Sequence, residues 1–167
     1  MNKDHVRFAT REVQFPEIKV MYIPVTAPHA EMRHTRNFFM KLGLYVFVKR
    51  GKPTGDVFIR YVGETTDEIE MEICFGVEAF LPETKQIKAK IIKAHSGKFA
   101  TGYYKGPRED LIDVYVEMQK WFVAQQLNRT GAPLIEYFVN DPRKTPASEL
   151  LTELYWPICD ELEKGKH

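Results

Sequence analysis

The chain has 167 residues, of which 44% are hydrophobic and 28% charged, the composition of an ordinary globular protein. Its 24 Lys and Arg residues against 23 Asp and Glu residues give a net charge of +1, which excludes an overall electrostatic attraction to nucleic acid or anionic lipid. A charged N-terminus, short apolar runs and two widely spaced cysteines, Cys74 and Cys159, predict a cytoplasmic protein with one domain over residues 1–167.

The first half of the chain predicts the order strand, helix, strand, strand. An extended stretch over residues 19–28 ends at a proline turn, which can open a helix. Apolar residues then recur at helical spacing, namely Met32, Phe39, Leu42 and Val46. A glycine turn at residues 52–55 separates this helix from strands over 55–62 and 70–77, with a polar loop between them.

The second half predicts the same order. An extended stretch over residues 98–107 ends at Pro107. A helix follows, with an apolar stripe at three- and four-residue steps, formed by Leu111, Val114, Tyr115, Met118, Trp121, Phe122 and Gln125. After the turn at residues 128–131, strands are expected over 131–138 and 151–158.

The two halves resemble each other. Gly55–Val62 aligns with Gly131–Phe138, Lys19–Pro28 with Lys98–Pro107, and Glu70–Val77 with Leu151–Ile158. We therefore predict a duplicated β-α-β-β unit, with repeat 1 over about residues 6–80 and repeat 2 over about 85–160. Such units form an α+β fold. We expect pseudo-two-fold symmetry, antiparallel sheets with helices on one face, and a central groove between the other faces.

Strand alternation assigns side chains to the two faces of each sheet. The small residues Ala100 and Gly102 suit a face under a helix, which leaves Tyr103 on the other. With one assumption about which face the helices cover, the helix-free faces carry Tyr22, Phe58, Arg60, Tyr103, Leu134, Glu136 and Tyr155. Tyr61, Tyr137 and Trp156 are expected on the helix-covered faces. The helix-free set of rings around a carboxylate and a guanidinium is the predicted ligand-binding site.

Three segments of the second half, residues 96–107, 132–142 and 151–158, resemble the GyrI-like family, also called bacterial transcription activator effector-binding domains. The resemblance extends over residues 6–160. It implies a duplicated β-α-β-β fold that binds drug-like, often aromatic and cationic small molecules in its central groove, hence multidrug binding. It also implies that a glutamate on a strand of the second repeat meets the ligand's positive charge, and Glu136 matches that glutamate.

The resemblance implies three functions for a chain of this kind. Similar domains occur in helix-turn-helix regulators, as gyrase-modulating proteins and as hydrolases of cyclopropane-bearing compounds. Residues outside 6–160 are too few for a DNA-reading module, so we expect a stand-alone member with no direct nucleic-acid binding and no membrane partner. Our main interpretation is capture of a hydrophobic, aromatic small molecule, with a positive charge on the ligand as a further expectation. The sequence predicts no particular oligomeric state.

Two alternative functions remain open, a hydrolase that uses the same residues and a protein-interaction module. A carboxylate among rings has a raised pKa and can serve either as an anchor for a cation or as a general acid or base. In a hydrolase, Glu136 would activate water while Tyr103 or Tyr155 donates to the electrophile. A protein-interaction module acting on a partner such as DNA gyrase is the other alternative. Arg60, aligned with Glu136, would weaken a preference for cations if the two residues pair.

No cofactor or metal is predicted. The chain has no glycine-rich phosphate-binding motif. His29 and His34 are five residues apart, whereas two zinc ligands on one helical face are four apart. His29-Ala30-Glu31 lacks the cysteine pair that completes a zinc deaminase site.

Overall fold

The computed structural model describes residues 5–29 and 35–159, and they divide into two compact units. The first unit comprises the described residues within 15–95, and the second comprises residues 5–14 and 96–159. Each unit combines one α-helix with antiparallel strand pairs. The predicted α+β class is therefore confirmed, and the order β-α-β-β occurs in each unit.

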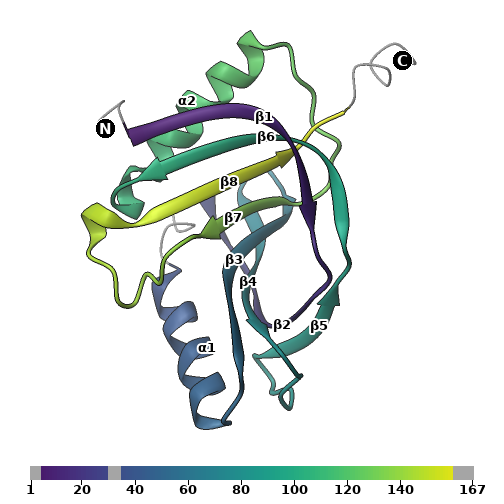
Figure 1. Cartoon of the computed structure of the whole chain (residues 1–167), viewed down its shortest axis with the longest axis vertical. Helices are drawn as coiled ribbons and strands as arrows, with labels where there is room; N and C mark the ends of the chain where they lie inside the picture. The colour runs from purple at the N-terminus through teal and green to yellow at the C-terminus, as the bar shows by residue number, and fades with distance from the viewer. Residues whose placement is uncertain (1–4, 30–34, 160–167) are drawn as a thin grey trace. The chain divides into compact units, whose positions relative to one another are not determined.

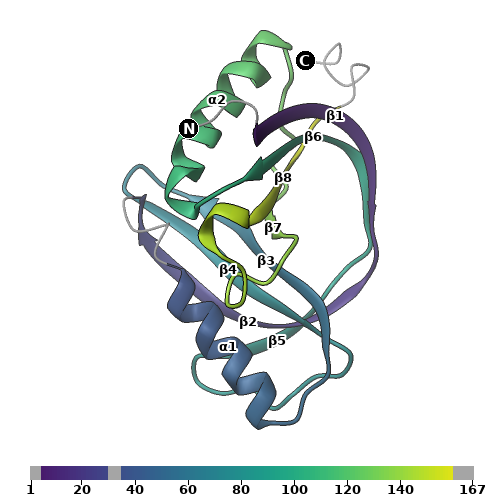
Figure 2. The ribbon, with the colours of Figure 1, turned by 60° about the vertical axis from the view of Figure 1, so that its left-hand side comes forward.

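The first unit contains β2 (Ile18–Pro28), α1 (Arg36–Val48), β3 (Pro53–Glu64), β4 (Glu68–Val77) and β5 (Lys88–Ile92). Its sheet has the order β3-β4-β2-β5, with each neighbouring pair antiparallel. The helix packs on β2 and β4 (Figure 2) through Phe39, Leu42 and Val46. The helix ends where Arg50 adopts the left-handed backbone conformation, with a φ of 56°. The Gly51 N–H donates to the Val46 carbonyl at 2.8 Å, which is a common way for a helix to end.

The second unit contains β1 (Val6–Phe15), β6 (His95–Lys105), α2 (Leu111–Ala124), β7 (Leu134–Phe138) and β8 (Leu151–Pro157) (Figure 1). Short 3₁₀ helices, Arg108–Asp110 and Ala147–Glu149, precede α2 and β8. The sheet order is β1-β6-β8-β7. Strand β1 lies beside β6, and β5 pairs with β2, so each flanking strand joins the unit formed mainly by the other half of the chain. The predicted repeat boundaries remain a prediction.

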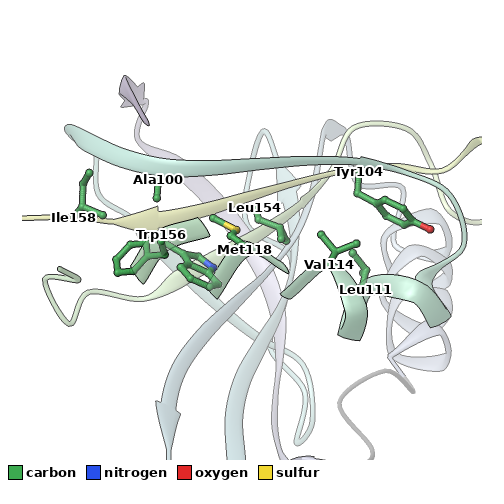
Figure 3. Close-up of a cluster of buried hydrophobic side chains, with 9 residues drawn as sticks. Ala100, Tyr104, Leu111, Val114, Met118, Leu154, Trp156 and Ile158 are labelled. Atoms are coloured by element: carbon green, nitrogen blue, oxygen red, sulfur yellow. The ribbon is translucent and has the colours of Figure 1, made fainter. Parts of the chain in front are cut away.

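The core of the second unit lies between α2 and its sheet. Leu111, Val114, Met118 and Phe122 of α2 pack with residues of β6 and β8 that include Ala100, Leu154 and Trp156 (Figure 3). Burying each large side chain contributes about 1.5–3 kcal/mol. A Cβ at Gly102 would lie 3.1 Å from the Met118 sulfur. The small residues Ala100 and Gly102 thus lie under the helix, as predicted, and so does Trp156.

Some residues named in the sequence analysis lie outside the residues that the structure describes. Met32, expected on the first helix, and Glu31 and His34, weighed as metal ligands, lie outside the described residues. Within the described ranges, no helix is long and apolar enough to cross a bilayer.

Candidate functional site

The sheet register places Glu136 on the face that α2 covers. Glu136 on β7 is directly opposite Leu154 on β8, and Leu154 belongs to the core under α2. Directly opposite residues point to the same face of a sheet, and alternation brings Leu134 to that face as well. The prediction that Glu136 and Leu134 lie on the helix-free face is therefore wrong. Tyr137, predicted to face the helix, lies on the opposite face.

A one-residue register difference explains the error. In the first unit Arg60 is opposite Glu72, whereas in the second unit Tyr137 is opposite Glu153. If Glu72 and Glu153 correspond, the counterpart of Arg60 is Tyr137, although the sequence alignment matched it with Glu136. A slip of one residue reverses every side chain of a strand, so an alignment without gaps assigned β7 to the wrong face.

Glu136 is enclosed by polar partners from the short helix before α2 and from α2 itself. Its side chain is 1% exposed. Arg108 donates from Nη1 to Oε2 at 2.7 Å, and the Tyr115 hydroxyl donates to Oε1 at 2.8 Å. The Arg108 guanidinium lies 4.8 Å from the centre of the Phe138 ring. Arg108 thus compensates the charge of Glu136 and Tyr115 adds a hydrogen bond, both within the second unit, and neither residue is among the site residues predicted from the sequence. Tyr115 had been placed only in the apolar stripe of the helix.

The opposite face of the same sheet carries a carboxylate among tyrosines. Glu153 on β8 is directly opposite Tyr103 on β6 and Tyr137 on β7. Tyr155, two residues further along β8 on the same face, donates its hydroxyl hydrogen bond to Glu153. Tyr103 and Tyr155 are therefore on the helix-free face, as predicted. We call Tyr103, Tyr137, Glu153 and Tyr155 the tyrosine–glutamate face.

Tyr155 keeps its proton over a wide pH range. Burial is the main cause that raises the pKa of Tyr155, and the hydrogen bond and charge of Glu153 raise it further, while Arg11 acts in the opposite direction. The ring meets Phe99 edge to face, with 6.1 Å between ring centres. Tyr155 is 8% exposed, whereas Tyr103, Tyr137 and Glu153 are half-buried. A neutral donor thus lies beside a carboxylate that solvent can reach.

The three predicted site residues of the first unit share one face of its sheet. Tyr22 and Phe58 are both opposite Cys74 of β4, and Arg60 is opposite Glu72. Arg60 donates to Glu72 at 2.5 Å, so it has an ion-pair partner within its own unit. Lys90 also pairs with Glu72, and its ammonium lies 4.6 Å from the centre of the Tyr22 ring. Two cations on one carboxylate give this face a different charge from the tyrosine–glutamate face.

Metal-ligating side chains are dispersed. Among the described residues, no three His, Cys, Asp or Glu side chains are grouped as metal ligands would be. The His29 ring nitrogen lies 3.1 Å from the Thr65 carbonyl oxygen and 3.7 Å from Glu64, which are contacts of a loop.

Residues 8–158 match the family model of the GyrI-like small-molecule-binding domain. The chain belongs to this family. A search of curated protein sequences finds no match. Among solved structures, the GyrI-like domain described here is similar to the EcmrR C-terminal domain, with a TM-score of 0.68 and 19% identity over 92% of this chain and 98% of that one. In the EcmrR–DNA complex the likeness has a TM-score of 0.69 at 20% identity and covers 90% of this chain, but only 57% of the longer EcmrR chain.

Two further similar structures are a ligand complex and a hydrolase. SAV2435 bound to tetraphenylphosphonium has a TM-score of 0.62 and 12% identity, over 93% of this chain and 96% of that one. A hydrolase encoded by lin2189 from Listeria innocua has a TM-score of 0.55 and 13% identity, over 90% and 91%. At these identities the likeness shows a shared fold.

The GyrI-like domain thus presents two chemically distinct carboxylates in its second unit. Glu136 is buried and paired with a guanidinium, an arrangement that holds α2 to the sheet. Glu153 is half-buried and has a phenol as its hydrogen-bond donor. A phenol leaves the negative charge of a carboxylate in place, so Glu153 can still attract a cation.

Proposed function

We propose that this protein binds a hydrophobic, aromatic small molecule with a positive charge, and that Glu153 on the tyrosine–glutamate face is its anionic contact. The observation that carries the proposal is the register of β6, β8 and β7, which sets Glu153 between Tyr103 and Tyr137 with Tyr155 beside it. Membership in a small-molecule-binding family supports it.

The chemistry of this face favours an organic cation. A cation over a tyrosine ring gains about 0.5–2 kcal/mol, and ring faces also bury the apolar part of a ligand. Half-burial of Glu153 weakens competition from water and strengthens its attraction to a positive charge. SAV2435, which shares the fold, was solved with tetraphenylphosphonium, a cation with four aromatic rings.

Glu136, the anchor predicted from the sequence, is the weaker candidate. A ligand cation would have to displace or compete with Arg108, which lies 2.7 Å from the carboxylate. Removing a partner from a buried charge costs several kcal/mol. Glu136 therefore serves as the comparison in the experiment, and Leu134, on the same helix-covered face, is likewise a weaker candidate for contact with the ligand.

The test is titration calorimetry with tetraphenylphosphonium, and with tetraphenylborate as an anion of matched size. We expect Glu153→Gln to weaken binding of the cation at least about tenfold, which is about 1.4 kcal/mol, and the wild-type protein to prefer the cation. Glu149→Gln, an exposed carboxylate just before β8, is the matched control. If Glu153→Gln binds tetraphenylphosphonium with unchanged affinity and Glu136→Gln does not bind it, the anionic contact of the ligand is Glu136.

The two alternative functions, a hydrolase and a protein-interaction module, predict different results with the same protein samples. Consumption of an electrophilic ligand over time, lost in Tyr155→Phe or Glu136→Gln, would favour the hydrolase, and the likeness to the Listeria innocua hydrolase is the reason to include this arm. Absence of binding by any aromatic cation or anion, with binding to purified DNA gyrase, would favour the protein-interaction module. Either outcome would overturn small-molecule capture as the main function.

A further inference from the structure

Helix α1 is apolar on both sides. Phe39, Leu42 and Val46 are buried, as expected for the side that meets a sheet. On the other side Met40, Leu44, Phe47 and Val48 are 46%, 63%, 80% and 63% exposed. We call these four side chains the outer stripe. Residues 40, 44 and 48 are four apart and share one line along the helix, and residue 47 lies beside that line.

The outer stripe is unusual for a surface helix, whose solvent side is normally polar. Figure 2 shows that one side of α1 faces away from the strands of the first unit. A contiguous set of large exposed apolar side chains marks a surface that binds something. The charges around the stripe indicate what that is.

Helix α1 and the turn that follows it contain only basic charged residues, although Glu78 on the neighbouring segment donates its backbone N–H to the Lys52 carbonyl. Between residues 35 and 55 the sequence contains no Asp or Glu and five basic residues, all exposed, namely Arg36, Lys41, Lys49, Arg50 and Lys52. The net charge of +1 for the whole chain conceals this local excess. Arg36 belongs to the first turn of the helix, Lys41 to its middle, and the other three follow its C-terminal end.

The other helix provides a contrast within the same protein. Ile112, Val116 and Val123 of α2 are 45%, 48% and 63% exposed, so α2 also has apolar side chains in solvent. Its sequence, however, includes Asp113 and Glu117. Exposed apolar side chains on a helix whose own charged residues are all basic therefore distinguish α1 from α2.

We infer that α1 docks on an anionic lipid surface, with the outer stripe inserted among the lipid chains at the interface and the basic residues beside the headgroups. Aromatic and aliphatic side chains flanked by Lys and Arg are the pattern of helices that lie in a membrane interface. Anionic headgroups attract juxtamembrane basic residues, and long lysine side chains can extend to them. This inference concerns the first unit and is independent of the proposed ligand site.

Two other occupants fit the charges less well. A second copy of the chain packed through the same stripe would bring two sets of five basic residues together, which is repulsive. Three of the five are lysines, a residue depleted from protein–protein interfaces. A lipid surface has the complementary charge and needs no matching cavity for the convex helix.

The experiment is co-sedimentation of the full chain with vesicles of phosphatidylcholine alone and with vesicles containing about 30% phosphatidylglycerol. We expect at least about tenfold stronger binding to the anionic vesicles, and loss of that preference in high salt. The double variant Leu44→Gln/Phe47→Gln, at exposed positions that glutamine tolerates in a helix, should reduce binding at least about tenfold. The matched control is Val123→Gln on α2, which has the same 63% exposure as Leu44.

Three outcomes would overturn the inference. One is failure of the wild-type protein to bind the anionic vesicles. Another is equal binding by the wild-type protein and the Leu44→Gln/Phe47→Gln variant, with circular dichroism confirming that both are folded. The third is self-association in sedimentation velocity that this variant abolishes while vesicles have no effect, which would assign the stripe to a second copy.

Discussion

Arg108 and Glu136 form a buried ion pair, with 2.7 Å between the guanidinium Nη1 and the carboxylate Oε2. The pair connects the short helix before α2 to strand β7. Tyr115 completes the arrangement from α2 itself. This relationship gives Glu136 a structural role, whereas Glu153 lies on the opposite face of the sheet with a phenol as its hydrogen-bond donor.

Loss of Arg108 should destabilise the protein strongly. In Arg108→Met the Glu136 carboxylate stays buried without its cation, and breaking a buried pair in this way costs about 3–5 kcal/mol. Urea unfolding followed by tryptophan fluorescence measures the free energy of unfolding. The double variant Arg108→Met/Glu136→Leu should recover much of the loss. Glu117→Gln, which removes an exposed pair with Lys120, should change stability by less than about 1 kcal/mol, and an equally small effect of Arg108→Met would contradict the structural role.

Alkaline pH should weaken the fold through Tyr155 and Tyr104. Burial is the main cause that raises the pKa of each, with added contributions from hydrogen bonds to Glu153 and Asp110. A group whose pKa is raised on folding contributes stability in full below its unfolded value, near about 10 for tyrosine, and loses it as the pH rises toward the folded value. We expect the free energy of unfolding to fall above about pH 10. The slope should be shallower in Tyr155→Phe and Tyr104→Phe, and slopes identical to wild type would refute the assignment.

A side chain at Gly102 should disturb the packing of α2. A Cβ there would lie 3.1 Å from the Met118 sulfur and 3.4 Å from Leu154 and Phe8. Overpacking of this kind costs about 1–3 kcal/mol, so Gly102→Val should lower the midpoint of thermal unfolding. Gly97→Val on the same strand is the control, because nothing lies within 4 Å of its Cβ position. Equal effects of the two substitutions would argue against close contact between α2 and β6.

The two thiols should differ in reactivity. Cys74 is buried, and burial is the main cause that raises its pKa, with Glu72 adding to it. The thiolate is the reactive form, so Cys74 should resist Ellman's reagent in the native protein. Cys159 is only partly buried and should react. We expect one thiol per chain to react natively and two in denaturant, whereas Cys159→Ser should leave no rapidly reacting thiol.

Much of the fold could be predicted because its signals are local. The apolar stripe from Leu111 to Phe122 and the small residues Ala100 and Gly102 describe a helix on a strand without reference to distant residues. Strand alternation likewise placed Tyr103 and Tyr155 on the face opposite α2. The family followed from ordered segments of the second half, and the match over residues 8–158 confirms it.

The site itself depended on pairing that no local pattern encodes. Whether Glu136 or Tyr137 faces the helix is decided by which residue of β8 it opposes, and a shift by one residue reverses the answer. Glu153, which is not among the site residues predicted from the sequence, lies between two tyrosines from two different strands. The amino-acid order determined which segments become helices and strands, because their periodicity is a property of neighbours. Only the tertiary structure decided that Glu136 is buried against a guanidinium and that Glu153 is half-buried beside a phenol, because a buried charge needs a partner from a distant segment, and the register of the sheet determines which partner it meets.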